Sequence, residues 1–525
     1  MNLPADQKQQ IDQVFAPWDQ PGSPGAALAV LLHGEVVYAK GYGLANLEYG
    51  QPITPQTVFH VASVSKQFTA MAVMLLVQDG LLDLHADIHR YLPDLPDFGH
   101  EINLWHLLHH TSGLRDQWEL LVAAGWRMDD VITREHILKL VERQRHLNFE
   151  PGAEYLYCNT GFTLAAEIVA KVSGKNLRRF CQERIFQPLD MAATHFHDDH
   201  EEIVPGRAYS YAPRAGGGWR KSILNYANVG ATGLFTTVLD LAKWLSNFEQ
   251  LAVGDEAALR QMETPFLLAN EQPTEYGLGL MLSEYRGQRE VGHSGADAGF
   301  RTWCGRFPEH GLGIVVLCNF APAVPRDLAH RVAEVILPEL RQTSAAVALP
   351  LPEDYCGEYF LLTDGSQLTI EQAGAGLTLL WQGQQVQLLP TDRETWTCSE
   401  SGMRILGQRD GKGRISGLAL QSPRMNLGVR RRPEFRLDPE KLREYAGNYR
   451  CEELAADYQL LVLDGSLVVR HQRHSDTTLI PAGADAFIGG SARLGDVSFR
   501  RDEHDQIIGM VWSGNRVRNL WFERQ

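Results

Sequence analysis

Ser63 and Lys66 are the side chains in this sequence best suited to covalent catalysis, because they stand three residues apart in an S-x-x-K run. Residues at this spacing share one face of a helix, so the lysine amine can reach the serine hydroxyl. A helix N-terminus also presents unpaired N–H groups and a positive dipole end, which favour negative charge on Ser63. The run predicts a nucleophilic serine, although a capping serine followed by a solvated lysine gives the same pattern by chance.

A tyrosine able to accept the serine proton comes from the triplet Tyr-Cys-Asn at 157–159, which follows a turn and precedes a helix. A neighbouring lysine cation lowers the pKa of a tyrosine, so Tyr157 is the predicted general base beside Lys66. Asn159 is expected to orient the lysine and a substrate amide. The same spacing recurs as Tyr-Ala-Asn at 226–228. We favour Tyr157 because its turn-then-helix setting places it at a domain edge.

The third element is the triplet His-Ser-Gly at 293–295, the only His-x-Gly of the chain, just before a segment with strand character that starts near Gly299. A backbone N–H at a strand edge can point at an oxyanion. We expect the N–H groups of Ser63 and Ala296 to form such an oxyanion hole, with His293 as a proton-bearing side chain beside it.

The run His-Phe-His-Asp-Asp-His at 195–200 is typical of a zinc site and so indicates an alternative, metal-dependent chemistry. Its ligands would be His195, His197, Asp199 and His200, and a zinc-activated water would replace the serine. This run follows a helix end, continues into two glutamates and reads as an exposed loop, whereas such strings in metallohydrolases end a buried strand. A zinc hydrolase is therefore the remote alternative, and no metal or other cofactor is expected.

Composition excludes several other classes of protein. The 525 residues carry a net charge of -15 and no basic run, which argues against nucleic acid as a partner. No apolar stretch approaches the roughly 20 residues that span a bilayer, and the N-terminus lacks the pattern of a signal peptide. The seven cysteines are scattered in apolar surroundings, as reduced core cysteines are. These features predict a cytoplasmic protein without a membrane partner.

The elements that would position Ser63, Tyr157 and His293 lie in the first 340 residues. Strand signals occur at both ends of this region, and helix signals lie between them. The pattern predicts an antiparallel sheet whose terminal segments meet, together with a helical region. Expected strands lie on either side of His33-Gly34 within 26–38, and at 276–282, 299–307 and 313–318; expected helices lie at 63–79, 159–174 and 238–251.

An internal repeat marks the rest of the chain, after an expected linker at 344–352. Tyr-x-Gly-x-Tyr at 355–359 recurs at 445–449, and Arg409 recurs as Arg501. Two copies of about 90 residues with frequent turns predict two small antiparallel β-barrels. The predicted domains are 1–342 for the hydrolase, 343–436 for the first barrel and 437–525 for the second.

Taken together, the three elements resemble those of the penicillin-recognising serine hydrolases, which include class C β-lactamases, D-alanyl-D-alanine carboxypeptidases, esterases and D-aminopeptidases. The resemblance covers residues 20–340 and is carried by VASVSKQFT (61–69), LLHHTSGL (107–114), FEPGAEYLYCNTGF (149–162), GATGLFTTVLDLAKW (230–244) and GHSGADAGF (292–300). It implies an α/β catalytic domain with catalytic Ser63, Lys66, Tyr157 and His293, and with Asn159, Gly295 and Ala296 as substrate or oxyanion contacts.

The two added barrels are most similar to those of three-domain D-aminopeptidases, which remove N-terminal D-residues from peptides, amides and esters. In those enzymes a loop of the last barrel enters the cleft; the corresponding stretch here, 485–496, looks short. A small peptide, amide or ester is thus the expected partner. Esterase or weak β-lactamase activity is the alternative. The oligomeric state is left open, with a homodimer as one expectation.

Overall fold

The computed structural model describes residues 3–214, 216–340, 351–362, 365–381, 383–392, 394–398, 403–422, 425–490 and 494–525. The chain divides into two compact units: Met1–Gln117 with Met128–Gln342, and Trp118–Arg127 with Thr343–Gln525. Most of the predicted linker at 344–352 lies outside the described residues. The three domain boundaries expected from the sequence therefore stay a prediction.

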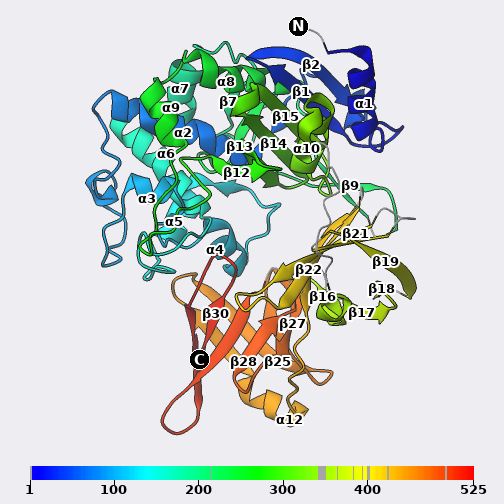
Figure 1. Ribbon diagram of the computed structural model, residues 1–525. Helices are drawn as coiled ribbons and strands as arrows, with labels where there is room; N and C mark the ends of the chain where they lie inside the picture. The colour runs from blue at the N-terminus through cyan, green and yellow to red at the C-terminus, as the bar shows by residue number, and fades with distance from the viewer. Residues whose placement is uncertain are drawn as a thin grey trace. The chain divides into compact units, whose positions relative to one another are not determined.

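A six-stranded antiparallel sheet forms the centre of the first unit (Figure 1). Its order is β12 (Met281–Tyr285), β13 (Gln288–Asp297), β14 (Phe300–Phe307), β15 (Leu312–Cys318), β1 (Ala26–Leu32) and β2 (Glu35–Tyr42). β1 pairs with β15 along its whole length, from Ala26 opposite Cys318 to Leu32 opposite Leu312. The prediction that early and late segments share one sheet is confirmed.

Helices cover both faces of this sheet. Ile314, Val316 and Cys318 point toward α1 (Ala5–Phe15) and α10 (Pro325–Ile336), with which they share an apolar core. Successive strand residues face opposite sides, so Gly313 faces the other layer. A Cβ built on Gly313 would lie 3.2 Å from the Leu245 side chain of α8 (Val238–Gln250), which places α8 on that opposite face.

The helical part of the first unit surrounds α2 (Ser65–Gln78), which is buried along nearly its whole length. A helix that is apolar all round must be enclosed, and α2 packs against α6 (Asn159–Ser173) and its neighbours. The other helices of this unit are α3 (Leu104–Leu108), α5 (Arg134–Val141), α7 (Leu177–Cys181) and α9 (Glu256–Met262). Helix α4 (Gln117–Ala123) belongs, except for its first residue, to the second unit. Small sheets join β3 (Leu44–Asn46) to β4 (Gln51–Pro52), β5 (Phe59–His60) to β11 (Leu234–Thr236) and β7 (His195–Phe196), β6 (Ile132–Thr133) to β10 (Tyr226–Ala227), and β8 (Tyr211–Pro213) to β9 (Trp219–Lys221).

The strand predicted at 276–282 begins later, at Met281. Gly279 has φ +70, which an extended strand does not allow, and a Cβ there would lie 2.6 Å from the backbone oxygen of Lys66. The chain therefore runs close to α2 before β12 starts. This course leaves Tyr276 outside the strand.

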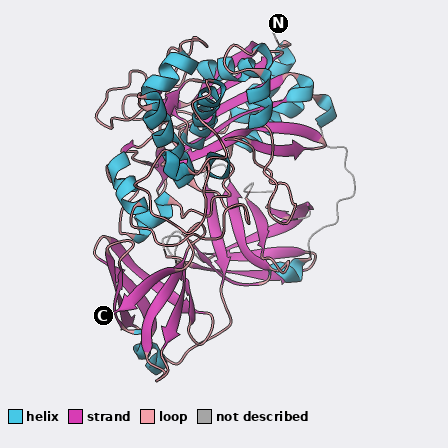
Figure 2. Ribbon diagram, turned by 90° about the vertical axis from the view of Figure 1, so that its left-hand side faces the viewer, coloured by secondary structure: helices cyan, strands magenta, loops and turns pink. Residues whose placement is uncertain are grey.

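Two closed antiparallel barrels follow (Figure 2). The first contains β16 (Gly357–Leu361), β17 (Gln367–Ala373), β18 (Gly376–Trp381), β19 (Gln384–Asp392), β20 (Thr395–Thr397), β21 (Arg404–Arg409), β22 (Ile415–Ser422) and β23 (Met425–Arg431). The second contains β24 (Gly447–Cys451), β25 (Ala456–Leu463), β26 (Ser466–His471), β27 (His474–Pro481), β28 (Ala486–Gly489), β29 (Asp496–Arg501), β30 (Ile507–Ser513) and β31 (Leu520–Arg524). The predicted pair of barrels is confirmed. Short helices, α11 (Pro352–Tyr355) and α12 (Pro439–Leu442), precede them.

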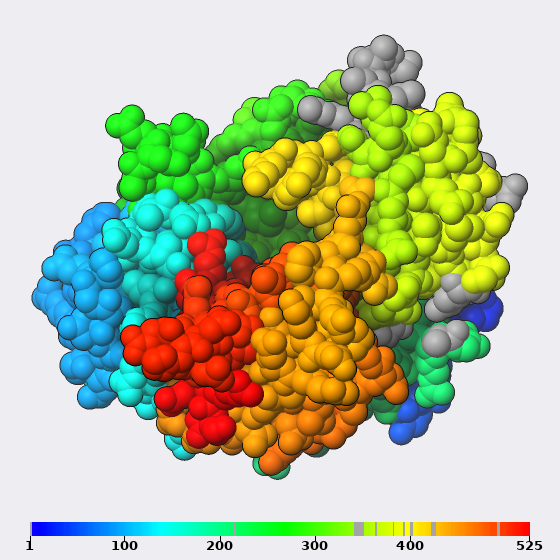
Figure 3. Space-filling model, turned by 90° about the horizontal axis from the view of Figure 1, so that it is seen from below, coloured from blue at the N-terminus to red at the C-terminus, as the bar shows by residue number. Residues whose placement is uncertain are grey.

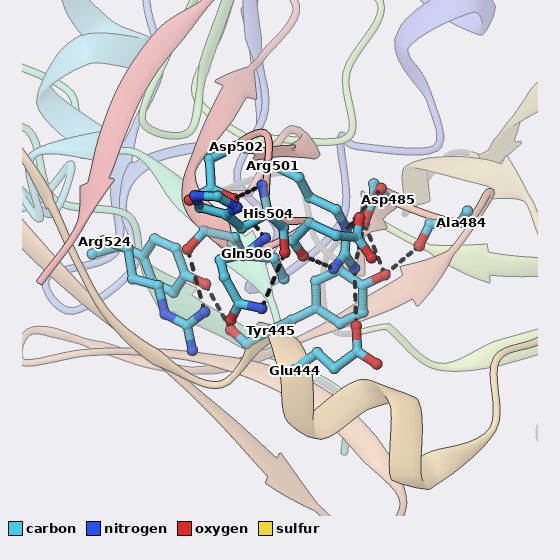
Figure 4. A network of polar contacts seen from close by, with 12 residues as sticks. Glu444, Tyr445, Ala484, Asp485, Arg501, Asp502, His504, Gln506 and Arg524 are labelled. Atoms are coloured by element: carbon cyan, nitrogen blue, oxygen red, sulfur yellow. Dashed lines mark hydrogen bonds and ion pairs between the residues drawn. The ribbon is translucent and has the colours of Figure 1, made fainter.

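The sequence repeat has the same contacts in each barrel. The Tyr359 hydroxyl donates to Tyr355 O at 2.7 Å, and the Tyr449 hydroxyl donates to Tyr445 O at 2.9 Å. In the second barrel, Arg501 joins Asp485 and Glu444 by ion pairs, and the Tyr445 hydroxyl donates to Asp485 (Figure 4). Corresponding contacts in the first barrel are those of Arg409 with Glu394 and Asp354, and of the Tyr355 hydroxyl with Glu394.

A short segment that is early in the sequence, 118–127, folds with the second barrel, whose surface is orange to red in Figure 3. The Tyr458 hydroxyl donates to Ala123 O at 2.8 Å, and Arg516 N donates to Glu119 Oε2 at 2.8 Å. Among the described residues, no helix combines the length and apolar composition needed to cross a bilayer.

Candidate active site

Ser63 lies in a single 3-10 turn (Ala62–Val64) that leads directly into α2. Ala62 has φ +49, a strained conformation for a residue with a Cβ. The turn is fixed by Ser65, whose hydroxyl donates to Ala62 O at 2.5 Å and accepts from Leu234 N at 3.1 Å. Ala62 and Val64 are fully buried while Ser63 is half-buried, so this turn presents the serine.

The Lys66 amine is buried next to this serine. Its Nζ lies 3.0 Å from Ser63 Oγ, 2.8 Å from Asn159 Oδ1 and 2.7 Å from Ala231 O. The one-turn spacing predicted from the sequence brings the amine and the hydroxyl within hydrogen-bond distance. A lysine that is 0% exposed requires such polar contacts, because burying a charge without them is costly.

Asn159 is itself held by a carboxylate that the sequence analysis missed. Both its backbone N and its Nδ2 donate to Asp116 Oδ2, at 2.7 and 2.8 Å. These bonds fix the amide so that Oδ1 faces Lys66. Asp116 follows the conspicuous run at 107–114, but it is 43 residues from Asn159, and no local pattern in the sequence connects them.

The structure separates the two competing Tyr-x-Asn triplets. Lys66 Nζ lies 4.9 Å from the centre of the Tyr157 ring, which also packs against His110 at a centroid distance of 4.2 Å. Tyr226 instead directs its hydroxyl at Met128 Sδ, at 3.7 Å. Tyr157 and Asn159 are therefore the pair that lies beside Lys66.

His293 lies in the middle of β13, not before a strand as expected, and it is 2% exposed. Its Nδ1 is 2.6 Å from Ser294 O, so Nδ1 must carry the proton. Nε2 then accepts from the Tyr276 hydroxyl at 2.7 Å. Burial lowers the pKa of His293 to about 3, and the Lys66 charge acts in the same direction. Both ring nitrogens of this neutral imidazole are thus engaged within the protein.

Tyr276 is a second residue that the sequence analysis missed, because the segment was predicted as a strand. It is buried against the rings of His110 and Tyr155, with centroid distances of 4.6 and 6.0 Å, and meets Tyr157 edge-on at 6.3 Å. Burial raises the pKa of Tyr276 well above its usual range, so it stays a neutral donor. It links His293 to the wall around Tyr157.

Gly295 lets β13 pass close to the turn that carries Ser63. A Cβ at this position would lie 2.3 Å from Val61 O and 3.1 Å from Ala62 Cβ, so no larger residue fits. The neighbouring Ala296 pairs with Arg301 of β14. The predicted oxyanion strand therefore runs directly alongside the turn that carries Ser63.

The zinc-like run does not form the predicted ligand set. His195, His197 and Glu202 lie together, with candidate ligand atoms within 4.8 Å of one another, whereas Asp199 and His200 are outside this group. The expected exposed loop is also wrong, because His195 pairs with Phe235 of β11 and His197 is 3% exposed. Tertiary packing against β11 explains both differences.

These residues could offer a metal two imidazoles and a carboxylate. His195 Nε2 and His197 Nδ1 are buried without a hydrogen-bond partner in the described part of the chain. Both Glu202 oxygens, however, accept from Arg178 at 2.6 and 2.7 Å. Burial lowers the pKa of His197 to about 4, and Arg207 adds to this. The arginine charges oppose a cation here.

Comparisons with known proteins agree with this geometry. A family model described as Beta-lactamase matches residues 11–337. A D-aminopeptidase from Gluconobacter oxydans is 28% identical over 464 residues, which cover 85% of this chain and 83% of that protein. The solved structure of D-amino acid amidase from Ochrobactrum anthropi, complexed with L-phenylalanine amide, is 28% identical with a TM-score of 0.55 and covers 64% of this chain and 100% of that one. The octameric penicillin-binding protein homologue from Pyrococcus abyssi shares the fold, with 24% identity and a TM-score of 0.59 over 81% of this chain and 99% of its own.

Proposed function

Because the chain belongs to the beta-lactamase family, we propose that it is a serine hydrolase that releases D-amino acids from the N-terminus of peptides, amides or esters. The names of similar proteins, D-aminopeptidase and D-amino acid amidase, support this substrate class. The reaction proceeds through an acyl-enzyme on Ser63.

One observation carries this proposal: the buried Lys66 amine contacts Ser63 Oγ at 3.0 Å, Asn159 Oδ1 at 2.8 Å and Ala231 O at 2.7 Å. The last two contacts fix the amine and leave the first as the path for the serine proton. In this proposal Lys66 and Tyr157 together accept that proton as Ser63 attacks the carbonyl carbon. They return it to the leaving amine or alcohol, and water then releases the acyl group by the reverse path.

The oxyanion is held by the N–H groups of Ser63 and Ala296, which the close approach of Gly295 to Val61 and Ala62 supports. We assign His293 a positioning role, because its two ring nitrogens contact Ser294 O and Tyr276. Its pKa of about 3 keeps it neutral, so it provides no cation for a substrate carboxylate. This favours substrates without a carboxylate at that position over C-terminal peptides and penicillins.

The test is hydrolysis of D-alanine p-nitroanilide against its L-isomer, with Ser63→Ala and the control Ser173→Ala, which is at the opposite end of α6 from Asn159. Fast D-selective turnover that is lost only in Ser63→Ala supports the proposal. Turnover of simple esters or β-lactams without any D-amino-acyl activity replaces it with the esterase or β-lactamase alternative. Activity that survives Ser63→Ala and disappears with a chelator overturns it in favour of the metal site.

We further propose that the protein acts in the cytoplasm, since six of its seven cysteines are buried, as reduced core cysteines are. Burial raises the pKa of Cys158, next to Tyr157, to about 12, as expected for a core residue. A homodimer stays a prediction, which sedimentation of the purified chain would test.

A further inference from the structure

Asp297 is the last residue of β13, on the face of the strand that meets the nucleophile turn. Side chains of a strand alternate between its two sides, so residues 293, 295 and 297 all face the same side. His293 contacts Tyr276 from this side, and a Cβ on Gly295 would touch Val61 and Ala62. The Asp297 side chain therefore belongs to the side of the sheet that carries Ser63.

One oxygen of this carboxylate is anchored close to Lys66. The Thr232 hydroxyl donates to Asp297 Oδ2, and His60 Nε2 lies 3.9 Å from the same oxygen. Thr232 directly follows Ala231, whose carbonyl accepts from the Lys66 amine. Within the described residues, the hydrogen bond from Thr232 and the contact with His60 both involve Oδ2, and the Asp297 side chain is 16% exposed. Oδ1 is left for a ligand.

Within the described residues, no lysine or arginine forms an ion pair with this carboxylate, and burial lowers the pKa of His60, which keeps that ring neutral. Burial raises the pKa of Asp297 to about 6, against the lowering effects of the Thr232 hydrogen bond and of the Lys66 and Arg301 charges. Arg301 Nη1 donates to Ala298 O and Phe300 O of the adjoining turn, and so is engaged elsewhere. A cation brought by a ligand would favour the ionised carboxylate.

Asp116, the other buried carboxylate near Lys66, is already engaged, because its Oδ2 accepts two bonds from Asn159. We propose, on the basis of the function proposed above, that Asp297 Oδ1 binds the α-ammonium group of the D-amino-acyl substrate while Ser63 attacks its carbonyl. In an α-amino acid the ammonium nitrogen is about 2.5 Å from the carbonyl carbon, so the two groups occupy adjoining parts of one site.

This contact explains how the site distinguishes enantiomers. When the carbonyl and the ammonium are both fixed, inversion at Cα exchanges only the side chain and the hydrogen. The side chain of one enantiomer then points toward open space in the site, and the side chain of the other points at the protein. A substrate without an ammonium has no such constraint.

The test compares two esters that differ only by the ammonium group: D-alanine p-nitrophenyl ester and p-nitrophenyl propionate, with rates corrected for spontaneous hydrolysis. In Asp297→Asn the preference for the alanine ester, as a ratio of kcat/KM values, should fall at least about tenfold, mainly through KM. Glu290→Gln is the matched control: this acid lies on the same strand but pairs with Arg326 and His330.

An unchanged preference in Asp297→Asn, or an equal loss on both esters through kcat, overturns the inference and assigns Asp297 to the Lys66 environment. Should Asp297→Asn not fold, inhibition of propionate hydrolysis in the wild-type protein decides: D-alaninamide should inhibit more strongly than propionamide, and equal inhibition overturns the inference. If the wild type hydrolyses propionate but no D-alanine ester, the proposed function fails as well. If the wild type is D-selective and Asp297→Asn keeps that preference, the inference alone fails.

Discussion

Two clusters of polar side chains in the first unit differ in how their neutral histidines are bonded. Around Ser63, the Lys66 amine contacts Asn159 and Ala231, and His293 has both ring nitrogens engaged. Around Glu202, the imidazoles of His195 and His197 each leave one nitrogen without a hydrogen bond in the described residues, and Arg178 holds the carboxylate.

The difference favours the Ser63 cluster as the site of proton transfer, because its donors and acceptors form one connected set. The Ser63 cluster has a hydroxyl, an amine and fixed acceptors within hydrogen-bond distance. The Glu202 cluster has two ring nitrogens without a hydrogen bond in the described residues, and its three grouped residues include no hydroxyl nucleophile. We therefore expect chemistry at the first cluster and at most metal capture at the second.

Lys66→Met gives the largest expected effect. It removes the amine that contacts Ser63, Asn159 and Ala231, so Tyr157 loses its partner in taking the serine proton and the buried acceptors lose their donor. Hydrolysis of p-nitrophenyl acetate should fall at least about 10³-fold. Lys243→Met is the control, since Lys243 pairs with Asp190 at the surface. Full activity in Lys66→Met would contradict the assignment of the chemistry to the Ser63 cluster.

Tyr276→Phe should have an intermediate effect. It removes the donor to His293 Nε2 and loosens the wall around Tyr157, so kcat for the same ester should fall by about tenfold. Tyr285→Phe, which removes a hydroxyl that contacts Glu334, is the matched control. Equal effects of the two substitutions would mean that Tyr276 only supports packing.

Acid should destabilise the protein partly through His293. Its folded pKa of about 3 is below the usual 6.5, so between these values the unfolded chain binds more protons. Stability therefore falls as the pH drops below 6.5, by up to about 2 kcal/mol at pH 5 from this residue. Urea unfolding at pH 7 and pH 5 should show a smaller loss in His293→Gln than in the wild type. An identical loss would mean that His293 is not neutral when folded.

Chelation should have the smallest effect. Incubation with EDTA, and separately Glu202→Gln, should each change ester hydrolysis by less than about twofold, because the second cluster takes no part in the reaction. Binding of Zn²⁺ to the second cluster can be followed by calorimetry with His195→Gln as the comparison. Loss of activity with EDTA that Zn²⁺ restores would mean that the Glu202 cluster takes part in the reaction.

Local patterns in the sequence predicted the parts of this site that depend on neighbours along the chain. The three-residue spacing of Ser63 and Lys66, the helix that begins at Asn159 and the paired strands at both ends of the catalytic unit follow from periodicity and turn signals. The two barrels could be predicted because the same turn and strand pattern occurs twice, about 90 residues apart, so two copies indicate the same fold.

Other parts depend on contacts between distant segments. Asp116 reaches Asn159 across 43 residues, and Tyr276 reaches His293 only because Gly279 carries the chain past α2. His197 looked exposed in sequence because the strand that buries its neighbourhood, β11, comes almost 40 residues later. No residue pattern within one element carries this information.

The contacts of residues 118–127 with the last barrel can form only after both parts of the chain have been synthesised. Ala123 and Tyr458 are 335 residues apart, and Glu119 and Arg516 are 397 apart. At a synthesis rate of about 5–20 residues per second, this segment leaves the ribosome roughly 20 to 80 s before its partners exist. The contacts between this segment and the second barrel can therefore form only when translation has nearly ended.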